Sequence, residues 1–388
     1  MCPGSPVRNS GHETFKIHHR RAAFSRLWQG GCVSLPPAAP VLHRAARAED
    51  AVRGMLERRM RRRGWRATIV PYTGYGAPGW VRVMGRVLLS RPGPGDAPPP
   101  GPETTTAAPN KKAKIVRGWR SFATVAVNAA EVEIEAGDRR RVLRTDRGGF
   151  IDARVEVDLP PGWQTVLIRT PGAKPVQVPV RIVDPAVTFG VVSDIDDTVM
   201  VTALPRPLLA AWNTFVLDEH ARAAVPGMAV LYERLVTAHP GAPVLYLSTG
   251  AWNVAPTLTR FLSRHLYPAG PLLLTDWGPQ RDRWFRSGQD HKRASLRRLA
   301  AEFPTVKWLL IGDDGQHDPE IYAEFARDHP ENVAAVAIRR LSPAQAVLAG
   351  ALPIHDNSPR SRGTGAQRWL WAPDGAGLSR LMREAGLL

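Results

Sequence analysis

Val187-Thr-Phe-Gly-Val-Val-Ser-Asp-Ile-Asp-Asp-Thr-Val-Met-Val201 is the stretch of sequence that decides the fold. It begins with an apolar, β-branched run, Val187 to Val192, which is typical of a buried strand. Three carboxylates follow it closely, those of Asp194, Asp196 and Asp197. Carboxylates crowded at the end of a buried strand repel one another and are costly to desolvate, so a bound cation is the natural compensation. Hard carboxylate oxygens select Mg²⁺ or Ca²⁺.

The position of these carboxylates favours a metal-dependent site, because ligands bind at the carboxyl ends of strands in open α/β sheets. The alternative is an acidic surface turn after a strand. An EF-hand loop is disfavoured, because Val199 stands at the sixth position, where that loop needs glycine.

Alternating strand and helix patterns follow from Pro185 onward and predict an α/β fold with a parallel sheet. Apolar runs predict strands at Val187–Val192, Val244–Leu247, Leu272–Leu274, Val306–Ile311 and Val333–Ile338. Amphipathic patterns predict helices at Gly227–Ala238, Ala255–Arg264, Lys292–Glu302, Pro319–Asp328 and Leu378–Leu388.

Asp194-Ile-Asp-Asp-Thr198 resembles the first motif, DxDxT, of the haloacid dehalogenase superfamily of phosphatases. The resemblance implies a Rossmann-like fold and three further motifs in a fixed order. In the second motif, Val244 to Gly250, Ser248 would hold phosphoryl oxygens at a helix N-terminus. In the third, Lys292 would offset charge between nucleophile and phosphate, and the alternative for Lys292 is a solvated surface lysine. We expect it close to the start of its helix, after Asp290.

The fourth motif is the acidic cluster that follows the strand Val306–Ile311. The resemblance implies that Asp313 binds Mg²⁺ directly. Either Asp314 or Asp318 would bind it through water or orient Lys292, and the sequence leaves this choice open. Asp318 before a proline also fits a helix N-cap.

The chemistry that the superfamily resemblance implies is phosphoryl transfer through an aspartyl-phosphate. Asp194 would attack phosphorus, and Asp196 would act as general acid and then general base. Mg²⁺ would be held by the Asp194 carboxylate, the Asp196 backbone carbonyl and Asp313. We expect Asp197 to hold the loop after the nucleophile. The expected substrate contacts are Thr198, Asn213, Thr249 and Gly250.

A closer resemblance is to the actin-patch phosphatidate phosphatase family and its bacterial relatives, and it extends from Arg66 to the C-terminus. It is carried by Ser193–Thr198, Asn213-Thr-Phe215, Val225–Tyr232, His291-Lys292 and Gly312–Tyr322. The resemblance implies Mg²⁺-dependent removal of phosphate from phosphatidate. Asp314 stands where that family usually has Ser, which bears on the choice of the second metal-site carboxylate.

The chain before the phosphatase-like region, which we place at residues 185–388, has three predicted parts. Residues 1–40 lack a sustained period and predict a disordered extension, or an extension from a start codon assigned too far upstream. Residues 41–65 predict a basic amphipathic helix, which either lies on an anionic membrane or packs on the next domain with a solvated face. Residues 66–184 predict an all-β, sandwich-like domain, interrupted by a Pro/Gly/Thr-rich loop at Arg91–Ala113. Its strands are expected at Val81–Leu89, Ala123–Val127, Glu131–Glu135, Arg154–Asp158, Gln164–Ile168 and Val176–Val180.

The net charge of +17 over 388 residues favours anionic partners such as phosphorylated substrates and acidic membrane surfaces. Arginine-rich coding from a GC-rich genome would explain this charge equally well. Specific nucleic-acid recognition is disfavoured, because aromatic interleaving and a recognisable binding motif are lacking. Two cysteines and no apolar run of about 18 residues favour a reducing, cytoplasmic location, compatible with peripheral membrane contact.

The function predicted from these observations is a Mg²⁺-dependent phosphatase for phosphatidate or a related lipid phosphate. The short segment Met200–Val225 after the first motif would form a partial lid over an open site, which suits a bulky or membrane-bound phosphoester. The alternatives are a phosphatase for a soluble or protein phosphoester and a non-catalytic phosphate-binding adaptor. The intact Asp194/Asp196 pair argues against the adaptor. The partner of the β-domain stays open.

Overall fold

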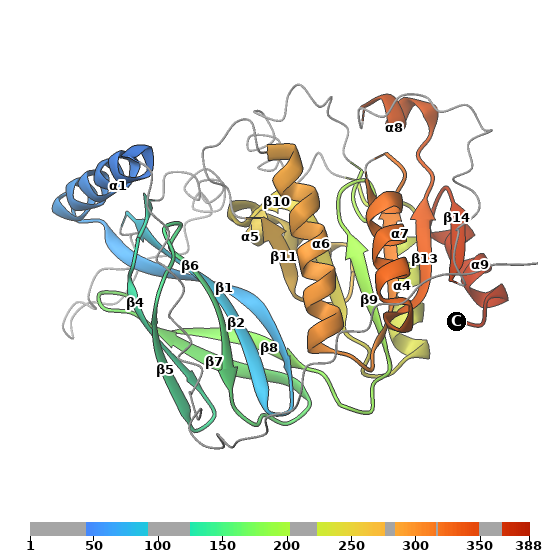
Figure 1. Cartoon of the computed structure of the whole chain (residues 1–388), viewed down its shortest axis with the longest axis horizontal. Coiled ribbons are helices and arrows are strands. Elements are labelled where there is room, and N and C mark those ends of the chain that lie inside the picture. Colours follow the sequence, from blue (N-terminus) through green and yellow to red (C-terminus); the bar gives the residue numbers. More distant parts are fainter. Residues whose placement is uncertain (1–43, 92–124, 202–222, 276–283, 316, 349–366) are drawn as a thin grey trace, which may run out of the picture. The chain divides into compact units, whose positions relative to one another are not determined.

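The computed structural model describes residues 44–91, 125–201, 223–275, 284–315, 317–348 and 367–388 (Figure 1). Residues 48–388 form one compact unit, and residues 1–47 form another, of which only the start of helix α1 (Arg44–Arg62) is described. The predicted extension at 1–40, nearly all of the predicted loop at 91–113, and residues 202–222 of the predicted lid, with Asn213, lie outside the described residues.

The phosphatase-like region contains a six-stranded sheet in the order β11-β10-β9-β12-β13-β14, in which every pairing is parallel. This confirms the predicted parallel α/β architecture and each of its predicted strands. Strand β14 was not predicted, because only Leu370 and Ala372 of its short sequence are buried. The strands are β9 (Phe189–Asp194), β10 (Val244–Ala251), β11 (Leu272–Thr275), β12 (Lys307–Asp313), β13 (Val333–Arg339) and β14 (Arg368–Ala372).

The strand order brings two acidic strand ends together. The chain passes from β9 to β10 and β11 on one side, then crosses to β12 on the other side of β9. Such a switch point in a parallel sheet is where ligands bind. Ile311 lies opposite Ser193 in the β9–β12 register, so Asp194 and Asp313, at the ends of these strands, become neighbours.

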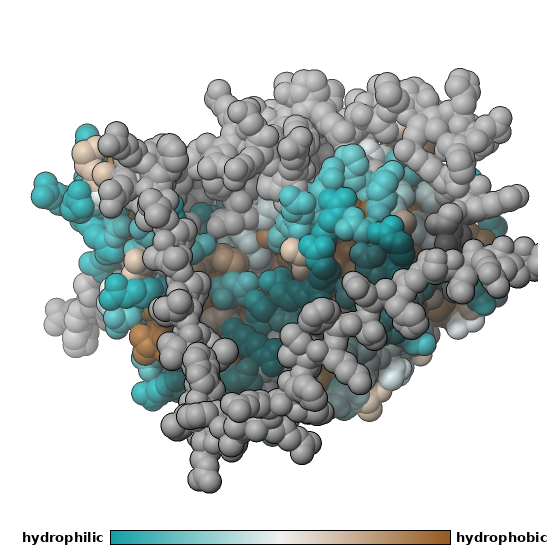
Figure 2. All heavy atoms as spheres, in the orientation of Figure 1, coloured by the Kyte–Doolittle hydropathy of each residue, from teal (hydrophilic) through white to brown (hydrophobic). Residues whose placement is uncertain are grey.

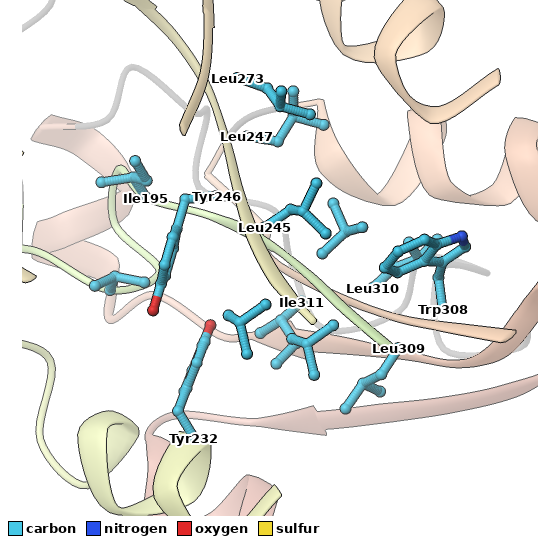
Figure 3. Packing of buried hydrophobic residues seen from close by; sticks show 14 of the residues in the cluster. Ile195, Tyr232, Leu245, Tyr246, Leu247, Leu273, Trp308, Leu309, Leu310 and Ile311 are labelled. Atoms are coloured by element: carbon cyan, nitrogen blue, oxygen red, sulfur yellow. The ribbon is translucent and has the colours of Figure 1, made fainter. Parts of the chain in front are cut away.

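Helices pack against the parallel strands and close a continuous apolar core (Figure 3). Helices α6 and α7 contact each other and pack on β10–β11 and β12–β13 respectively, while α9 packs on β13–β14 and contacts α4. Residues Trp308–Ile311 are fully buried, which explains why β12 reads as an unbroken apolar run. The helices are α4 (Met228–Ala238), α5 (Ala255–Arg264), α6 (Trp284–Glu302), α7 (Asp318–Asp328), α8 (Pro343–Leu348) and α9 (Gly375–Glu384).

Helix α6 corrects one prediction. It begins at Trp284, so Lys292 lies inside the helix rather than at its start. The sequence before Lys292 contains Gly288, and glycine lowers the helix propensity of such a stretch. Gly288 serves close packing here, because a Cβ at this position would lie 3.1 Å from the Thr249 side chain.

The described residues between helix α1 and the parallel sheet form β-strands, as predicted, and have their own core of alternating inward residues. Its sheet has eight strands in the order β3-β2-β1-β8-β7-β4-β5, with β6 paired to β2. Only the β1–β8 pair is parallel. Because pairing joins all eight strands in one sheet, a two-sheet sandwich stays a prediction. The strands are β1 (Arg66–Ala77), β2 (Trp80–Ser90), β3 (Val125–Ala126), β4 (Glu131–Ala136), β5 (Arg139–Arg144), β6 (Phe150–Glu156), β7 (Gly162–Arg169) and β8 (Val176–Ile182).

None of the described helices is long and apolar enough to cross a bilayer.

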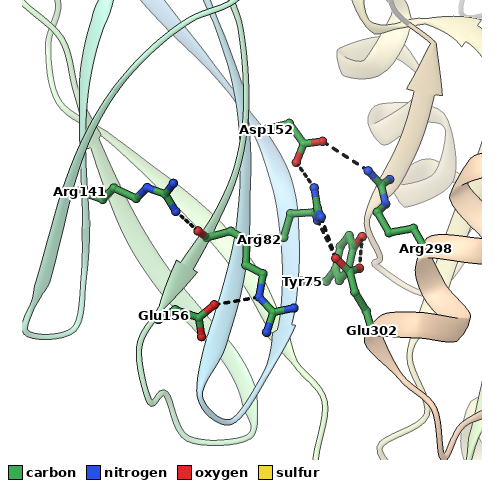
Figure 4. A network of polar contacts seen from close by, with 8 residues as sticks. Tyr75, Arg82, Arg141, Asp152, Glu156, Arg298 and Glu302 are labelled. Atoms are coloured by element: carbon green, nitrogen blue, oxygen red, sulfur yellow. Dashed lines mark hydrogen bonds and ion pairs between the residues drawn. The ribbon is translucent and has the colours of Figure 1, made fainter. Parts of the chain in front are cut away.

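The two sheets are joined through Glu302, the last residue of α6 (Figure 4). Its carboxylate accepts hydrogen bonds from the Tyr75 hydroxyl at 2.8 Å and from Arg82 Nη2 at 2.7 Å. Arg82 also pairs with Asp152, which Arg298 of α6 contacts at 3.4 Å. The side chains of Glu302 and Arg82 are only 6% and 14% exposed, so this ion pair is largely shielded from water.

Glu302→Ala should lower the free energy of unfolding by about 3 kcal/mol, because it leaves Arg82 and the Tyr75 hydroxyl short of a buried partner. Glu156→Ala is the matched control. It removes an ion pair with Arg154 whose side chains are 71% and 44% exposed, so we expect a change below about 0.5 kcal/mol. Urea unfolding of both variants measures the difference, and equal losses would contradict a structural role for Glu302.

Candidate active site

Three carboxylates converge where β9, β12 and α7 meet. Asp194 ends β9, Asp313 ends β12, and Asp318 is the first residue of α7. One carboxylate oxygen from each lies within 4.8 Å of the others, and all three side chains are buried. The geometry therefore brings the first and fourth predicted motifs into one cluster.

Lys292 connects two members of this cluster. Its Nζ donates hydrogen bonds to Asp194 Oδ1 at 2.7 Å and to Asp318 Oδ1 at 2.5 Å, and its side chain is 3% exposed. Burial alone would lower the pKa of Lys292, but the two carboxylates raise that pKa above its ordinary value. Lys292 is thus a fixed positive charge beside Asp194, and the alternative of a solvated lysine is wrong.

Negative charge exceeds positive charge at this site. Among the described residues, the buried charged side chains are five aspartates and two cations, namely Asp194, Asp196, Asp197, Asp313, Asp318, Lys292 and Arg339. Burial raises the pKa of Asp194 well above its usual value; Lys292 opposes this shift, and Asp318 and Asp196 add to it. Burial also raises the pKa of Asp313, and repulsion by Asp318 and Asp194 adds to it.

The cluster fits a divalent cation. Within the described part of the chain, the Oδ2 atoms of Asp194, Asp313 and Asp318 are buried and have no hydrogen-bond partner. Buried polar atoms ordinarily have partners, so these three oxygens are available to a cation bound by the cluster. Carboxylate oxygens without nitrogen or sulfur donors suit Mg²⁺ or Ca²⁺.

The structure distinguishes Asp314 from Asp318, the two carboxylates between which the sequence left the choice open. Asp318 joins the cluster, whereas the Asp314 side chain turns away and accepts a hydrogen bond from the Leu341 amide at 2.8 Å. Asp314 therefore lies outside this group of three carboxylates, and its role as a metal-site residue stays a prediction. Asp318 is not the N-cap of α7, because His317 occupies that position.

Gly312 makes room for Asp318. A Cβ at position 312 would lie 2.6 Å from Asp318 Oδ2 and 2.8 Å from the Tyr322 ring. Any larger residue would push the Asp318 carboxylate out of the cluster, so this glycine helps to fix the geometry of the site.

Ser248 and Asp196 also lie together. Ser248 Oγ donates to Asp196 Oδ2 at 2.9 Å and accepts from the Gly250 amide at 2.9 Å. Thr275 Oγ1, on β11, donates to the carbonyls of Thr249 and Gly250 at 2.9 and 3.1 Å. The second predicted motif is thus an ordered loop whose serine contacts the residue predicted to be the general acid.

Thr198 and Asp197 complete the loop after β9. Thr198 is fully buried, and its hydroxyl has no hydrogen-bond partner among the residues described. Asp197 has a positive φ of 57°, a backbone conformation that is uncommon outside glycine. Its amide donates to the Met200 carbonyl at 2.8 Å, which closes the loop as predicted for this residue.

Arg339 is a site residue that the sequence reasoning missed. It ends β13, is 3% exposed, and its guanidinium donates to the Asp197 carbonyl at 2.5 Å and the Pro373 carbonyl at 3.2 Å. The available signal was its position, because it follows the apolar run Val333–Ile338 at a strand end, as Asp194 and Asp313 follow theirs.

Comparison with known proteins associates this site with a phosphatase family. Residues 189–340 match the sequence model described as Phosphatidate phosphatase APP1, catalytic domain. Phosphatidate phosphatase APP1 of Saccharomyces cerevisiae is 26% identical over 220 residues, which are 55% of this chain and 36% of that protein. An uncharacterized protein of Schizosaccharomyces pombe is 28% identical over 152 residues, 39% of this chain and 25% of that protein. The chain therefore spans about a third or less of the curated relatives that it matches.

Solved structures add little. A carbohydrate acetylesterase from Xanthomonas citri is 10% identical, over 72% of this chain and 70% of that chain, with a TM-score of 0.24. An overlay of that quality carries no argument about fold or activity. The informative comparisons are therefore those of sequence, which relate residues 189–340 to a phosphatidate phosphatase catalytic domain.

Mg²⁺ at 10 to 100 times its dissociation constant should stabilise the protein by about 1.4 to 2.7 kcal/mol and raise the melting temperature by a few degrees. Asp313→Asn should abolish this shift, because it removes a charged oxygen from the cluster. Asp314→Asn is the matched control, because the Asp314 carboxylate bonds the Leu341 amide and lies outside the cluster. This variant should keep the Mg²⁺-dependent rise in melting temperature. Thermal melts with Mg²⁺ and with chelator measure both, and equal shifts in the two variants would contradict this assignment.

Proposed function

We propose that this chain is a Mg²⁺-dependent phosphatase of the haloacid dehalogenase type, which removes phosphate from phosphatidate or a related lipid phosphate. One observation carries the proposal. The segment that matches a phosphatidate phosphatase catalytic domain contains a buried aspartate, Asp194, held by Lys292 and flanked by carboxylate oxygens without partners. A soluble phosphoester is the alternative substrate.

The first chemical step uses Asp194 and Asp196. An Asp194 oxygen forms a bond to phosphorus while the bond from phosphorus to the leaving oxygen breaks, which gives an aspartyl-phosphate. Asp196 supplies the proton that the leaving oxygen needs. The Ser248 hydroxyl, which donates to Asp196 at 2.9 Å, would orient this carboxyl group and contact a phosphoryl oxygen.

In the second step Asp196 acts as a base instead of an acid, and Asp194 becomes the leaving group. Asp196 takes a proton from water, whose oxygen bonds to phosphorus while the Asp194–phosphorus bond breaks, and inorganic phosphate results. Lys292 holds Asp194 in place and offsets negative charge through both steps. Mg²⁺ bound by Asp194, Asp313 and Asp318 would neutralise phosphoryl charge and let two anions approach.

Helix α1 supports a lipid substrate. Val52, Met55 and Leu56 are 59%, 60% and 40% exposed, an unusual exposure for apolar side chains on one helix. Exposed arginines occupy the C-terminal half of the same helix and the residues after it, namely Arg58, Arg59, Arg61, Arg62 and Arg63. Figure 2 shows this helix as mostly hydrophilic, with apolar atoms among the polar ones. Such a helix suits the surface of an anionic membrane, where apolar side chains enter the interface and arginines meet headgroups.

Asp194→Asn should reduce phosphate release from phosphatidate in mixed micelles by about three orders of magnitude or more, because it removes the attacking anion. Asp328→Asn, an exposed change on α7, serves as the control and should leave turnover unchanged. EDTA should abolish the wild-type activity. Turnover retained by Asp194→Asn, or full activity in chelator, would refute the mechanism.

Replacement of Arg58, Arg59 and Arg62 by Gln should weaken binding to phosphatidate-containing vesicles by about 100-fold, at about 1 kcal/mol for each charge. Replacement of Arg139, Arg140 and Arg141 by Gln, on edge strand β5, changes the net charge equally and should weaken binding less. Binding should also fall as salt rises. Vesicle sedimentation measures all three. Equal losses of vesicle binding in the α1 and β5 variants would mean that net charge, and not helix α1, attracts the protein to the membrane. If the wild-type protein does not bind vesicles at low salt, the soluble substrate is favoured.

A further inference from the structure

Trp252 connects the antiparallel sheet to the phosphate-binding loop of the candidate site. It directly follows β10 and opens the 3-10 turn η3 (Trp252–Val254). Although it belongs to the parallel-sheet region, its ring stacks on Tyr72 of β1 with centroids 4.4 Å apart and packs on Phe150 of β6 at 4.8 Å. The Tyr72 hydroxyl donates to the Trp252 carbonyl at 3.3 Å, and Trp252 is 5% exposed.

The end of β10, just before Trp252, needs an anchor because its pairing with β11 is irregular. In the β10–β11 register, Leu247 lies opposite Leu273, and the next pair is Ala251 with Thr275. Residues 248–250 therefore bulge out of the ladder. A bulge loses regular backbone pairing and re-aims the side chains it carries. Here it carries Ser248, whose hydroxyl contacts Asp196.

The bulge is fixed at two points in the described structure. On the β11 side, Thr275 Oγ1 bonds the carbonyls of Thr249 and Gly250. After the bulge, the chain is held where the Trp252 ring and carbonyl meet Tyr72 and Phe150. The second point belongs entirely to the antiparallel sheet.

We infer that Tyr72 and Phe150 are positioning residues for Ser248 and act through Trp252. The antiparallel sheet is then part of the scaffold of the active site, a role that its separate core does not indicate. The catalytic consequence rests on the proposed phosphatase function. A displacement of about 1 Å in a catalytic group can cost about 100-fold in rate, so loss of this anchor should reduce kcat by about 10- to 100-fold.

Two tyrosines of β1 provide a matched comparison. Tyr72 is 6% exposed and stacks on Trp252, whereas Tyr75 is 2% exposed and meets Glu302 and Phe303. Both therefore lie at the junction of the two regions, but only Tyr72 contacts the residue next to the bulge. Tyr72→Leu should increase amide hydrogen exchange in peptides that cover residues 247–254 and lower kcat. Tyr75→Leu should lower the melting temperature and leave both readings near wild type.

Two further variants, Tyr72→Phe and Phe150→Leu, test whether stacking on Trp252 causes the effect. Tyr72→Phe keeps the stacking and should restore kcat and exchange to near wild-type values. Phe150→Leu, at a half-buried position, should reproduce the effect of Tyr72→Leu if that variant fails to fold. Unchanged exchange in both Tyr72→Leu and Phe150→Leu, or equal kcat losses in Tyr72→Leu and Tyr75→Leu, would overturn the inference. An inactive wild-type protein would refute the proposed function, while hydrogen exchange would still decide whether Tyr72 holds the bulge.

Discussion

The buried ammonium of Lys292 is the contact on which the rest of the site depends. By bonding Asp194 and Asp318 it ties α6 to the end of β9 and to the first turn of α7. Without it, the buried carboxylates of Asp194 and Asp318 would lie close together with no positive charge between them. Among the described residues, five aspartates and two cations are buried, and a buried charge costs free energy unless it is paired. This excess of carboxylates fits a site that could hold a metal ion.

The sequence allowed the parallel sheet to be predicted because its strands are buried on both faces and read as unbroken apolar runs. It also placed Asp194, Asp313 and Lys292 at one site, through two acidic strand ends and the order of the motifs. Strand β5 could not be predicted in the same way. Its arginine-rich sequence is exposed, and Arg140 meets Glu133 and Glu135 of β4 only across the sheet, at 3.6 and 3.8 Å.

The choice between Asp314 and Asp318 required the structure, because it depends on where side chains point after the strand has ended. Asp313 is the last residue of β12 and reaches the cluster, whereas Asp314 lies in the bend after the strand and bonds the Leu341 amide instead. Asp318 returns to the cluster because α7 begins there and Gly312 leaves space for it. Arg339 was missed for a similar reason, since two of its partners, the carbonyls of Asp197 and Pro373, belong to the backbone and leave no side-chain pattern in the sequence.

The aromatic contacts between the two sheets have a consequence for how such a protein can change over evolutionary time. Tyr72 and Tyr75 belong to one apolar cluster with Trp252 and Phe303 of the other region. A gene truncated before the parallel sheet would encode a domain with these aromatic rings uncovered, and exposed apolar patches promote self-association. Each region therefore depends on the other to keep these rings out of solvent. A substitution at Tyr72 in one lineage would favour a compensating one at Trp252, although these residues lie far apart in the sequence.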